Sequence, residues 1–248
     1  MSVLVLVLVV LFCSIALLFP RKQARSSSRI AAVKRNSPVI LRQLVYRGGD
    51  WDANPGSLRN LARFASNCEA IKLDVRAGEP ANGRDLPGSD FFVYATGHHG
   101  FDLAGSDLTG FLSFVRAGGF VLVDDNRGMD AAFRRFVAQN FPEARLEPVR
   151  SGEEVFRKPY NVGSMPKIMI HDGSPAVLYR LKEGQDLNLY YSFSSDLGDG
   201  WEDSLRHRVP EETRRLALEM GTNLIALAFA WSSAARERRG NFAARNSS

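Results

Sequence analysis

The sequence contains few cysteines, and this excludes several classes of protein. Cys13 lies in an apolar leader and Cys68 stands alone in the body of the chain. An intramolecular disulfide framework is therefore excluded, and the cysteine and histidine spacing of a zinc finger is absent. The G-x-S-x-G elbow, the P-loop and the G-x-G-x-x-G fingerprint are missing too. No internal repeat is present, so a repeat architecture is not expected.

Positive charge is scarce in the body of the chain, although the chain as a whole is basic. The net charge is +5 and the pI is near 9.4. Residues 20–35 have a net charge of +6 and the tail from Arg236 has +3, which leaves about −4 for the rest. The basic pI therefore belongs to the two flanking segments. We expect no nucleic-acid partner for the folded body.

Residues 1–19 predict a membrane anchor, because the run from Val3 to Phe19 is apolar apart from Ser14. The run lacks a preceding basic region and a following small-residue cleavage site, which favours an uncleaved anchor over a secretory signal. Residues 20–38 form a basic linker that keeps the domain cytoplasmic under the positive-inside tendency. An upstream start codon with a basic segment would make it periplasmic instead. The sequence thus predicts a single-pass membrane protein with one transmembrane helix and the membrane as a partner.

The stretch 90–130 predicts a βαβ unit. Residues 91–95 and 119–123 are short apolar runs typical of buried strands. Between them, Leu108, Phe111, Leu112 and Val115 recur at helical spacing. The crossover should be right-handed and the strands parallel, so both following loops lie at the same sheet edge. Open α/β folds bind their ligands at this edge.

The rest of the domain, 39–231, alternates strands and helices, and a disordered tail is expected at 232–248. We predict further strands at 39–46, 70–75, 146–149 and 187–193, helices at 55–67, 130–140 and from 210, and an irregular excursion at 150–166. A hairpin around Asp172-Gly173 would join residues 167–170 to 176–181. This pattern predicts an α/β, three-layer sandwich whose mostly parallel sheet has an antiparallel addition near the C-terminus.

Four of the predicted strands are followed by polar loops rich in aspartate and glycine. If the strands are parallel, the loops converge and form a pocket for a polar ligand such as a glycan or a peptide. Aspartate and glycine are also common turn residues, so each loop taken singly is equally compatible with a turn. The candidate ligand-binding residues are Asp50, Trp51, His98, His99, Asp124, Asp125, Asn126, Asp199, Trp201 and Glu202.

The carboxylates of Asp124 and Asp125 end a buried strand, where their repulsion requires a cation, a basic partner such as Arg127, or a shifted pKa. The adjacent His98 and His99 fit a metal ligand, a general base or a structural pair. The alternative function is therefore a metal-assisted hydrolase that holds a divalent metal with His98, His99, Asp124 and Asp125, assisted by Asp199. Otherwise no cofactor is expected. The other two histidines, His171 and His207, are predicted to be solvated.

Five blocks carry a resemblance to a known family: QLVYRGGDWDANP, FFVYATGHHGFDL, GGFVLVDDN, FRRFVAQNFPEARLEPV and SDLGDGWEDS. In this order they resemble an uncharacterised bacterial family, the domain of unknown function 4159, over roughly 39–231. The resemblance implies a class I glutamine amidotransferase-like, flavodoxin-like fold without its cysteine nucleophile. The place of that nucleophile reads Thr96-Gly97-His98-His99. Because the resemblance implies no reaction, we expect a membrane-tethered, non-catalytic binding module, with the hydrolase as the alternative.

Overall fold

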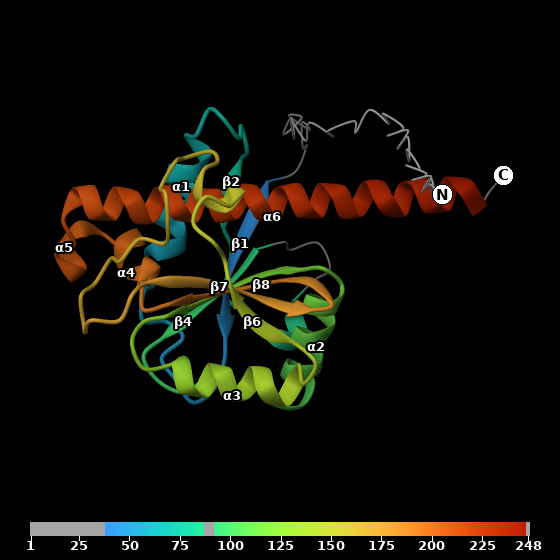
Figure 1. Cartoon of the computed structure of the whole chain (residues 1–248), viewed down its shortest axis with the longest axis horizontal. Helices are drawn as coiled ribbons and strands as arrows, with labels where there is room; N and C mark the ends of the chain where they lie inside the picture. The colour runs from blue at the N-terminus through green and yellow to red at the C-terminus, as the bar shows by residue number, and fades with distance from the viewer. Residues whose placement is uncertain (1–37, 87–91, 247–248) are drawn as a thin grey trace, which may run out of the picture. The chain divides into compact units, whose positions relative to one another are not determined.

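One mixed β-sheet with helices on both faces forms the fold (Figure 1). The structure is a computed structural model that describes residues 38–86 and 92–246. These residues belong to one compact unit, Ala32–Ser248. The predicted three-layer α/β sandwich is confirmed.

The sheet has the strand order β2-β1-β4-β5-β8-β7-β6, with β3 beside β1. Counted in chain order, the parallel strands β1, β2, β4, β5 and β8 lie in the order 2-1-3-4-5, which is the flavodoxin-like arrangement. β7 runs antiparallel to both β8 and β6, as the predicted antiparallel addition. The strands are β1 (Val39–Val45), β2 (Val75–Ala77), β3 (Ala81–Asn82), β4 (Phe92–Gly97), β5 (Phe120–Asp125), β6 (Arg145–Pro148), β7 (Val177–Glu183) and β8 (Gln185–Phe193).

Helices α1 and α6 pack on one face of the sheet, and α2 and α3 on the other (Figure 1). Residues 150–176 have little regular structure, as predicted for 150–166. The helices are α1 (Ser57–Ser66), α2 (Gly105–Arg116), α3 (Asp130–Asn140), α4 (Leu197–Trp201), α5 (Ser204–His207) and α6 (Glu211–Asn246), with single 3-10 turns at η1 (Gly83–Asp85) and η2 (Glu154–Phe156).

Each face of the sheet has its own apolar core. Tyr94 and Leu122 pack with α1 and α6, whereas Val93 and Val121 pack with α2 and α3. Neighbouring residues enter different cores because side chains alternate along a strand. All residues of β4 and β5 are buried, as expected of central parallel strands covered on both faces.

The predicted βαβ unit is present, and both of its strands are longer than expected. β4 includes Thr96 and Gly97, and β5 includes Asp124 and Asp125, which pair with them in register. The two polar segments expected as loops therefore begin inside the sheet. Their side-chain directions are fixed by the strand pleat, which matters for the site below.

One predicted strand is absent, and another begins later than predicted. No strand is present at 167–170, and β7 instead turns at Gly184, whose φ is 69°, to pair with β8. The Asp172-Gly173 turn does exist, since Asp172 accepts a hydrogen bond from the backbone N–H of Ser174, but strands do not flank it. Residues 70–74 are also not a strand, because the backbone N–H groups of Ile71 and Lys72 bond back to the carbonyl of Cys68 after α1.

The prediction of a transmembrane helix is corrected as well. Within 38–86 and 92–246, no helix is both long enough and apolar enough to cross a membrane. The longest helix, α6, includes charged residues such as Arg214, Arg215 and Glu219. The predicted anchor and all but the last residue of the basic linker lie outside the described residues. Helix α6 extends to Asn246 and so includes most of the segment expected to be a disordered tail.

Candidate functional site

The loops that follow β1, β4, β5 and β8 meet at the carboxyl edge of the sheet. Asp50, after β1, bonds to His98, after β4. A Cβ on Gly128, after β5, would lie 2.2 Å from the carbonyl oxygen of His98. Asp124 accepts hydrogen bonds from backbone N–H groups after β8. These polar segments, which are far apart in the sequence, therefore form one continuous rim.

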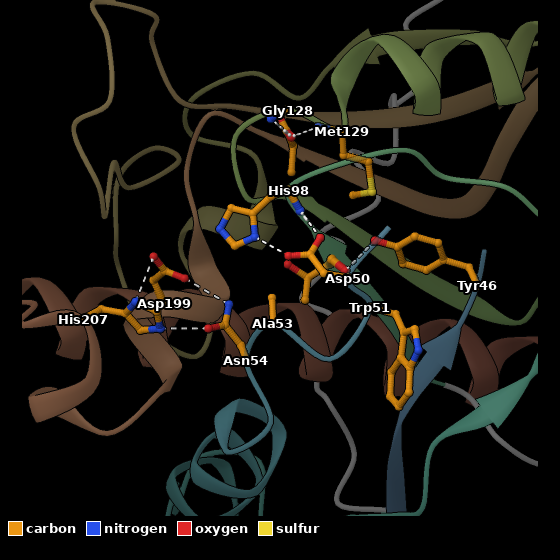
Figure 2. A network of polar contacts seen from close by, with 12 residues as sticks. Tyr46, Asp50, Trp51, Ala53, Asn54, His98, Gly128, Met129, Asp199 and His207 are labelled. Carbon is orange, nitrogen blue, oxygen red and sulfur yellow. Dashed lines mark hydrogen bonds and ion pairs between the residues drawn. The ribbon is translucent and has the colours of Figure 1, made fainter. Parts of the chain in front are cut away.

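Asp50 holds His98 in a fixed orientation (Figure 2). Its Oδ1 accepts the backbone N–H of His98 at 2.7 Å, and its Oδ2 lies 2.6 Å from Nδ1 of the same residue. Burial raises the pKa of Asp50, but the bonds from His98 outweigh it and the net pKa is lowered. The carboxylate thus stays ionised and fixes the proton on Nδ1, so the other ring nitrogen, Nε2, is left to accept a proton or a hydrogen bond.

The packing behind this pair leaves room only for glycine at position 97. A Cβ there would lie 2.1 Å from the hydroxyl oxygen of Tyr46 and 3.0 Å from Oδ1 of Asp50. The Tyr46 hydroxyl donates to the carbonyl of Thr96 at 2.9 Å. His99 is exposed, and its ring centroid is 6.2 Å from that of His98. The two histidines therefore differ in role, and only His98 is oriented by a carboxylate.

Asp124 is fully buried below this rim. Its Oδ2 accepts the hydroxyl of Tyr94 at 2.9 Å and the N–H of Gly198 at 2.8 Å, while its Oδ1 accepts the N–H of Leu197 at 3.3 Å. Burial raises the pKa of Asp124 to about 6 against these hydrogen bonds. The carboxylate thus anchors the start of α4 to β5.

Asp125 faces the opposite side of the sheet. Its Oδ1 accepts the N–H groups of Gly128 and Met129 at 3.0 and 2.8 Å, just before α3. Burial raises its pKa as well. Because consecutive strand residues alternate, Asp124 and Asp125 lie on opposite faces, and this geometry, their hydrogen bonds and their raised pKa values relieve the expected repulsion.

A second histidine is held by the loop after β8. Asp199, at 5% exposure, accepts the side-chain N–H of Asn54 at 3.0 Å, and its Oδ2 lies 3.6 Å from Nδ1 of His207. Nε2 of His207 lies 3.0 Å from Oδ1 of Asn54. Both ring nitrogens are thus engaged (Figure 2). Glu202 is also buried and accepts the N–H of Gly56, which ties the loop before α1 to the same region.

Asp196 is the aspartate of this edge that lacks hydrogen bonds. It is fully buried with φ at 62°, and neither carboxylate oxygen has a hydrogen-bond partner within the described residues. Nε2 of His171 lies 3.0 Å from Oδ2, a distance typical of an ion pair, but the geometry is not that of a hydrogen bond. Burial, followed by the charges of Asp124, Asp199 and Asp125, raises the pKa of Asp196 to about 8.

Asn126 lies directly after β5, and its side chain likewise lacks hydrogen-bond partners among the described residues. Its side chain is 1% exposed, and both its amide nitrogen and its amide oxygen lack partners in the part of the chain that the structure describes. Buried polar side chains are nearly always hydrogen-bonded, to protein, ordered water or a ligand. Two such residues, Asn126 and Asp196, after neighbouring strands therefore indicate a place for a bound polar group.

The two tryptophans proposed for the rim have different environments. Trp201 is fully buried, its ring centroid lies 5.0 Å from that of Tyr94, and its indole N–H donates to the carbonyl of Ala217 at 2.8 Å. It cannot stack on a ligand at the surface. Trp51 is partly buried against the opposite core. The rim is thus acidic and histidine-bearing, with Trp51 as the tryptophan that solvent reaches.

A family model described as domain of unknown function (DUF4159) matches residues 40–229. The chain belongs to this family. The predicted resemblance is thereby confirmed over almost the whole sheet and its helices. The comparison with curated proteins finds no significant match.

In this DUF4159 domain, the residues of the alternative metal site have separate partners. His98 bonds to Asp50, Asp124 to Tyr94 and α4, and Asp125 to the start of α3. Across the described ranges, no three histidine, cysteine, aspartate or glutamate side chains are grouped so that they could hold a metal ion.

Sequence reasoning missed two histidine–aspartate contacts of the domain. His171 and His207, expected to be solvated, have side chains only 24% and 23% exposed and lie against Asp196 and Asp199. Asp196 lies three residues after the predicted strand 187–193, in one of the polar loops that follow predicted strands, and this position was an available indication. Nothing in the sequence indicated that residues 167–176 would place His171 beside it.

Proposed function

We propose that the carboxyl edge of the sheet binds a polar ligand, a peptide or a glycan, and that the domain is a non-catalytic binding module. The observation that supports this proposal is the pair of buried side chains, Asn126 and Asp196, that have no hydrogen-bond partner among the described residues where four strand-end loops converge. Leaving such groups unpaired costs about 1–3 kcal/mol each. A ligand that offers donors and acceptors would recover this free energy on binding.

A peptide is favoured over a glycan. A surface tryptophan that stacks on a sugar ring would support a glycan, but Trp201 lies in the core and Trp51 is partly buried against the opposite core. The aliphatic side chains of Ile170 and Leu205 are instead 86% and 89% exposed. Each is within two residues of a histidine that contacts an aspartate of the site, His171 or His207. Exposed aliphatic side chains beside buried polar groups suit the alternating chemistry of a peptide.

Ligand-detected NMR with the purified chain tests the proposal. The probes are short acetylated peptides of mixed composition and neutral oligosaccharides. We expect saturation transfer to peptides, abolished in Asn126→Leu, which has similar volume but no amide. Asn161→Leu, a change at an exposed asparagine, serves as the matched control and should bind like the parent. Equal transfer to the parent and to Asn126→Leu would refute a site at this edge.

A second candidate function is hydrolysis with His98 as a general base. It is favoured by the orientation of His98 on Asp50, which leaves Nε2 available. Each peptide that binds would be incubated with the protein, and hydrolysis products would be sought by mass spectrometry. Cleavage that is lost in His98→Gln and kept in His99→Gln would support this function. If the peptides remain intact after incubation with the parent, hydrolysis is refuted and only the binding function remains.

A further inference from the structure

We infer that Asp196 receives a cationic group of the ligand, an ammonium or guanidinium such as a basic peptide side chain supplies. This inference rests on the proposed binding function and names the charge that the site selects. It follows from a comparison of the buried carboxylates at the edge. The others accept hydrogen bonds from the protein, whereas Asp196 accepts none from residues 38–86 and 92–246.

The contrast between these carboxylates is sharp. Asp124 accepts three hydrogen bonds, and Asp125 accepts two from backbone N–H groups. Asp199 accepts one from Asn54 and lies 3.6 Å from His207. The two oxygens of Asp196 accept none within the described residues, although its side chain is fully buried. A donor is therefore missing at Asp196 and nowhere else among these four.

The cationic residues around Asp196 do not supply that donor. Nζ of Lys167 bonds to the carbonyl of Ser174 at 3.0 Å and to the hydroxyl of Ser194 at 2.5 Å. Arg127 is exposed, and its positive charge acts on His171. Burial, then Arg127 and Lys167, lower the pKa of His171, so its neutral form is favoured.

The negative charges around Asp196 determine which kind of hydrogen-bond donor is favoured there. Ionised Asp196 would lie among Asp124, Asp125 and Asp199, all of which repel it. A neutral hydroxyl donor would leave this repulsion in place, whereas an ammonium or guanidinium would offset it and form charge-assisted hydrogen bonds. His171 is a partly exposed neighbour of this carboxylate: its side chain is 24% exposed, and its Nε2 lies 3.0 Å from Oδ2 of Asp196.

Binding of a cation should also release a proton. Without ligand, Asp196 holds its proton at neutral pH, because its pKa is about 8. A bound cation favours the carboxylate, so the proton must leave as the complex forms. A neutral ligand has no such requirement. Proton release therefore distinguishes charge recognition from simple filling of the site by a polar group or water.

Isothermal titration of the full chain tests the inference with two capped peptides, acetyl-Ala-Lys-Ala-amide and acetyl-Ala-Gln-Ala-amide. At pH 7 we expect the lysine peptide to bind at least about tenfold more tightly, the factor that 1.4 kcal/mol represents. Its binding enthalpies in phosphate and in Tris should differ by close to the difference between the ionisation enthalpies of the two buffers, as expected when about one proton is released. Both effects should disappear in Asp196→Asn and persist in Asp52→Asn, which removes the same charge from an exposed position between β1 and α1.

Each other outcome has a defined meaning. Equal affinity of the two peptides would overturn the inference and leave the proposed binding function standing. A lysine preference that survives in Asp196→Asn would assign the cation to another residue and would also overturn it. Binding of oligosaccharides alone would do the same, whereas binding of no probe would refute the proposed function together with the inference. Melting temperatures measured in parallel verify that each variant is folded.

Discussion

Replacing Asp196 by asparagine should stabilise the protein, and the gain should grow with pH. Asparagine tolerates the left-handed φ of 62° at this position and carries no charge that burial can penalise. The folded-state pKa of Asp196 is about 8, against an ordinary value of 3.8. Between these values the unfolded chain has lost the proton while the folded protein keeps it. The contribution of Asp196 to the free energy of unfolding is therefore fully present below pH 3.8 and is lost as pH rises toward 8.

The size of the effect follows from the pKa difference. One pKa unit corresponds to about 1.36 kcal/mol, so a shift of roughly four units costs the folded state about 5–6 kcal/mol at pH 8 or above. An asparagine at 196 still leaves a buried amide without partners, which offsets about 1–3 kcal/mol of the gain. The expected net stabilisation at pH 8 is about 2–5 kcal/mol. For a domain of this size that is an increase of roughly 5–15 °C in melting temperature.

Thermal unfolding of the parent and Asp196→Asn from pH 4 to 9 checks this prediction. Asp124 also has a raised pKa, but at about 6 its contribution ends earlier. The interval between about pH 6.5 and 8.5 thus reports mainly on Asp196. At pH 4 the variant should be no more stable than the parent, because only the cost of its unpaired amide then remains, and it should become the more stable protein as pH rises above about 6. A variant that is less stable than the parent at pH 8, or a difference that does not change with pH, would refute the reasoning.

Three further substitutions test the arrangement of the site. Gly97→Ala should destabilise the protein by more than about 2 kcal/mol in urea unfolding, because the new methyl group meets Tyr46, and a neutral result would mean that the contact is not rigid. Trp201→Ala should cost about 3–5 kcal/mol, as expected of a core residue, while Trp51→Ala should cost clearly less; similar losses would contradict the burial difference. Asp50→Asn should lower the reactivity of the His98 ring toward diethyl pyrocarbonate, because the carboxylate that makes Nε2 more nucleophilic is lost, and should leave that of His99 unchanged; unchanged labelling of His98 would show that Asp50 does not activate it.

The parts of the fold that could be predicted depend on local pattern. β4 and β5 are continuous apolar runs, and Phe111 and Val115 fall on one helix face, so the central unit follows from periodicity. The convergence of the strand-end loops then follows from the parallel arrangement. The family match supports the same architecture.

The remainder depends on contacts between distant segments. The strand at 177–183 pairs with β8 through Gly184, a choice that propensity does not distinguish from a hairpin at Asp172-Gly173. Trp201 is buried because the short helix α4 packs against α6, and an isolated loop sequence rich in aspartate and glycine does not show this. The contact of His171 with Asp196 likewise requires the irregular segment to fold over the end of β8.

The opposite directions of Asp124 and Asp125 have a consequence for how reliably β5 can pair. A slip of one residue would exchange the two carboxylates between the layers, so that neither the start of α4 nor that of α3 would find its acceptor. The adjacent carboxylates of Asp124 and Asp125 thus favour the correct register of β5 through contacts on both faces of the sheet. The same pair that borders the candidate site also penalises the misaligned strand, and incorrect pairings of β5 are disfavoured before any ligand is present.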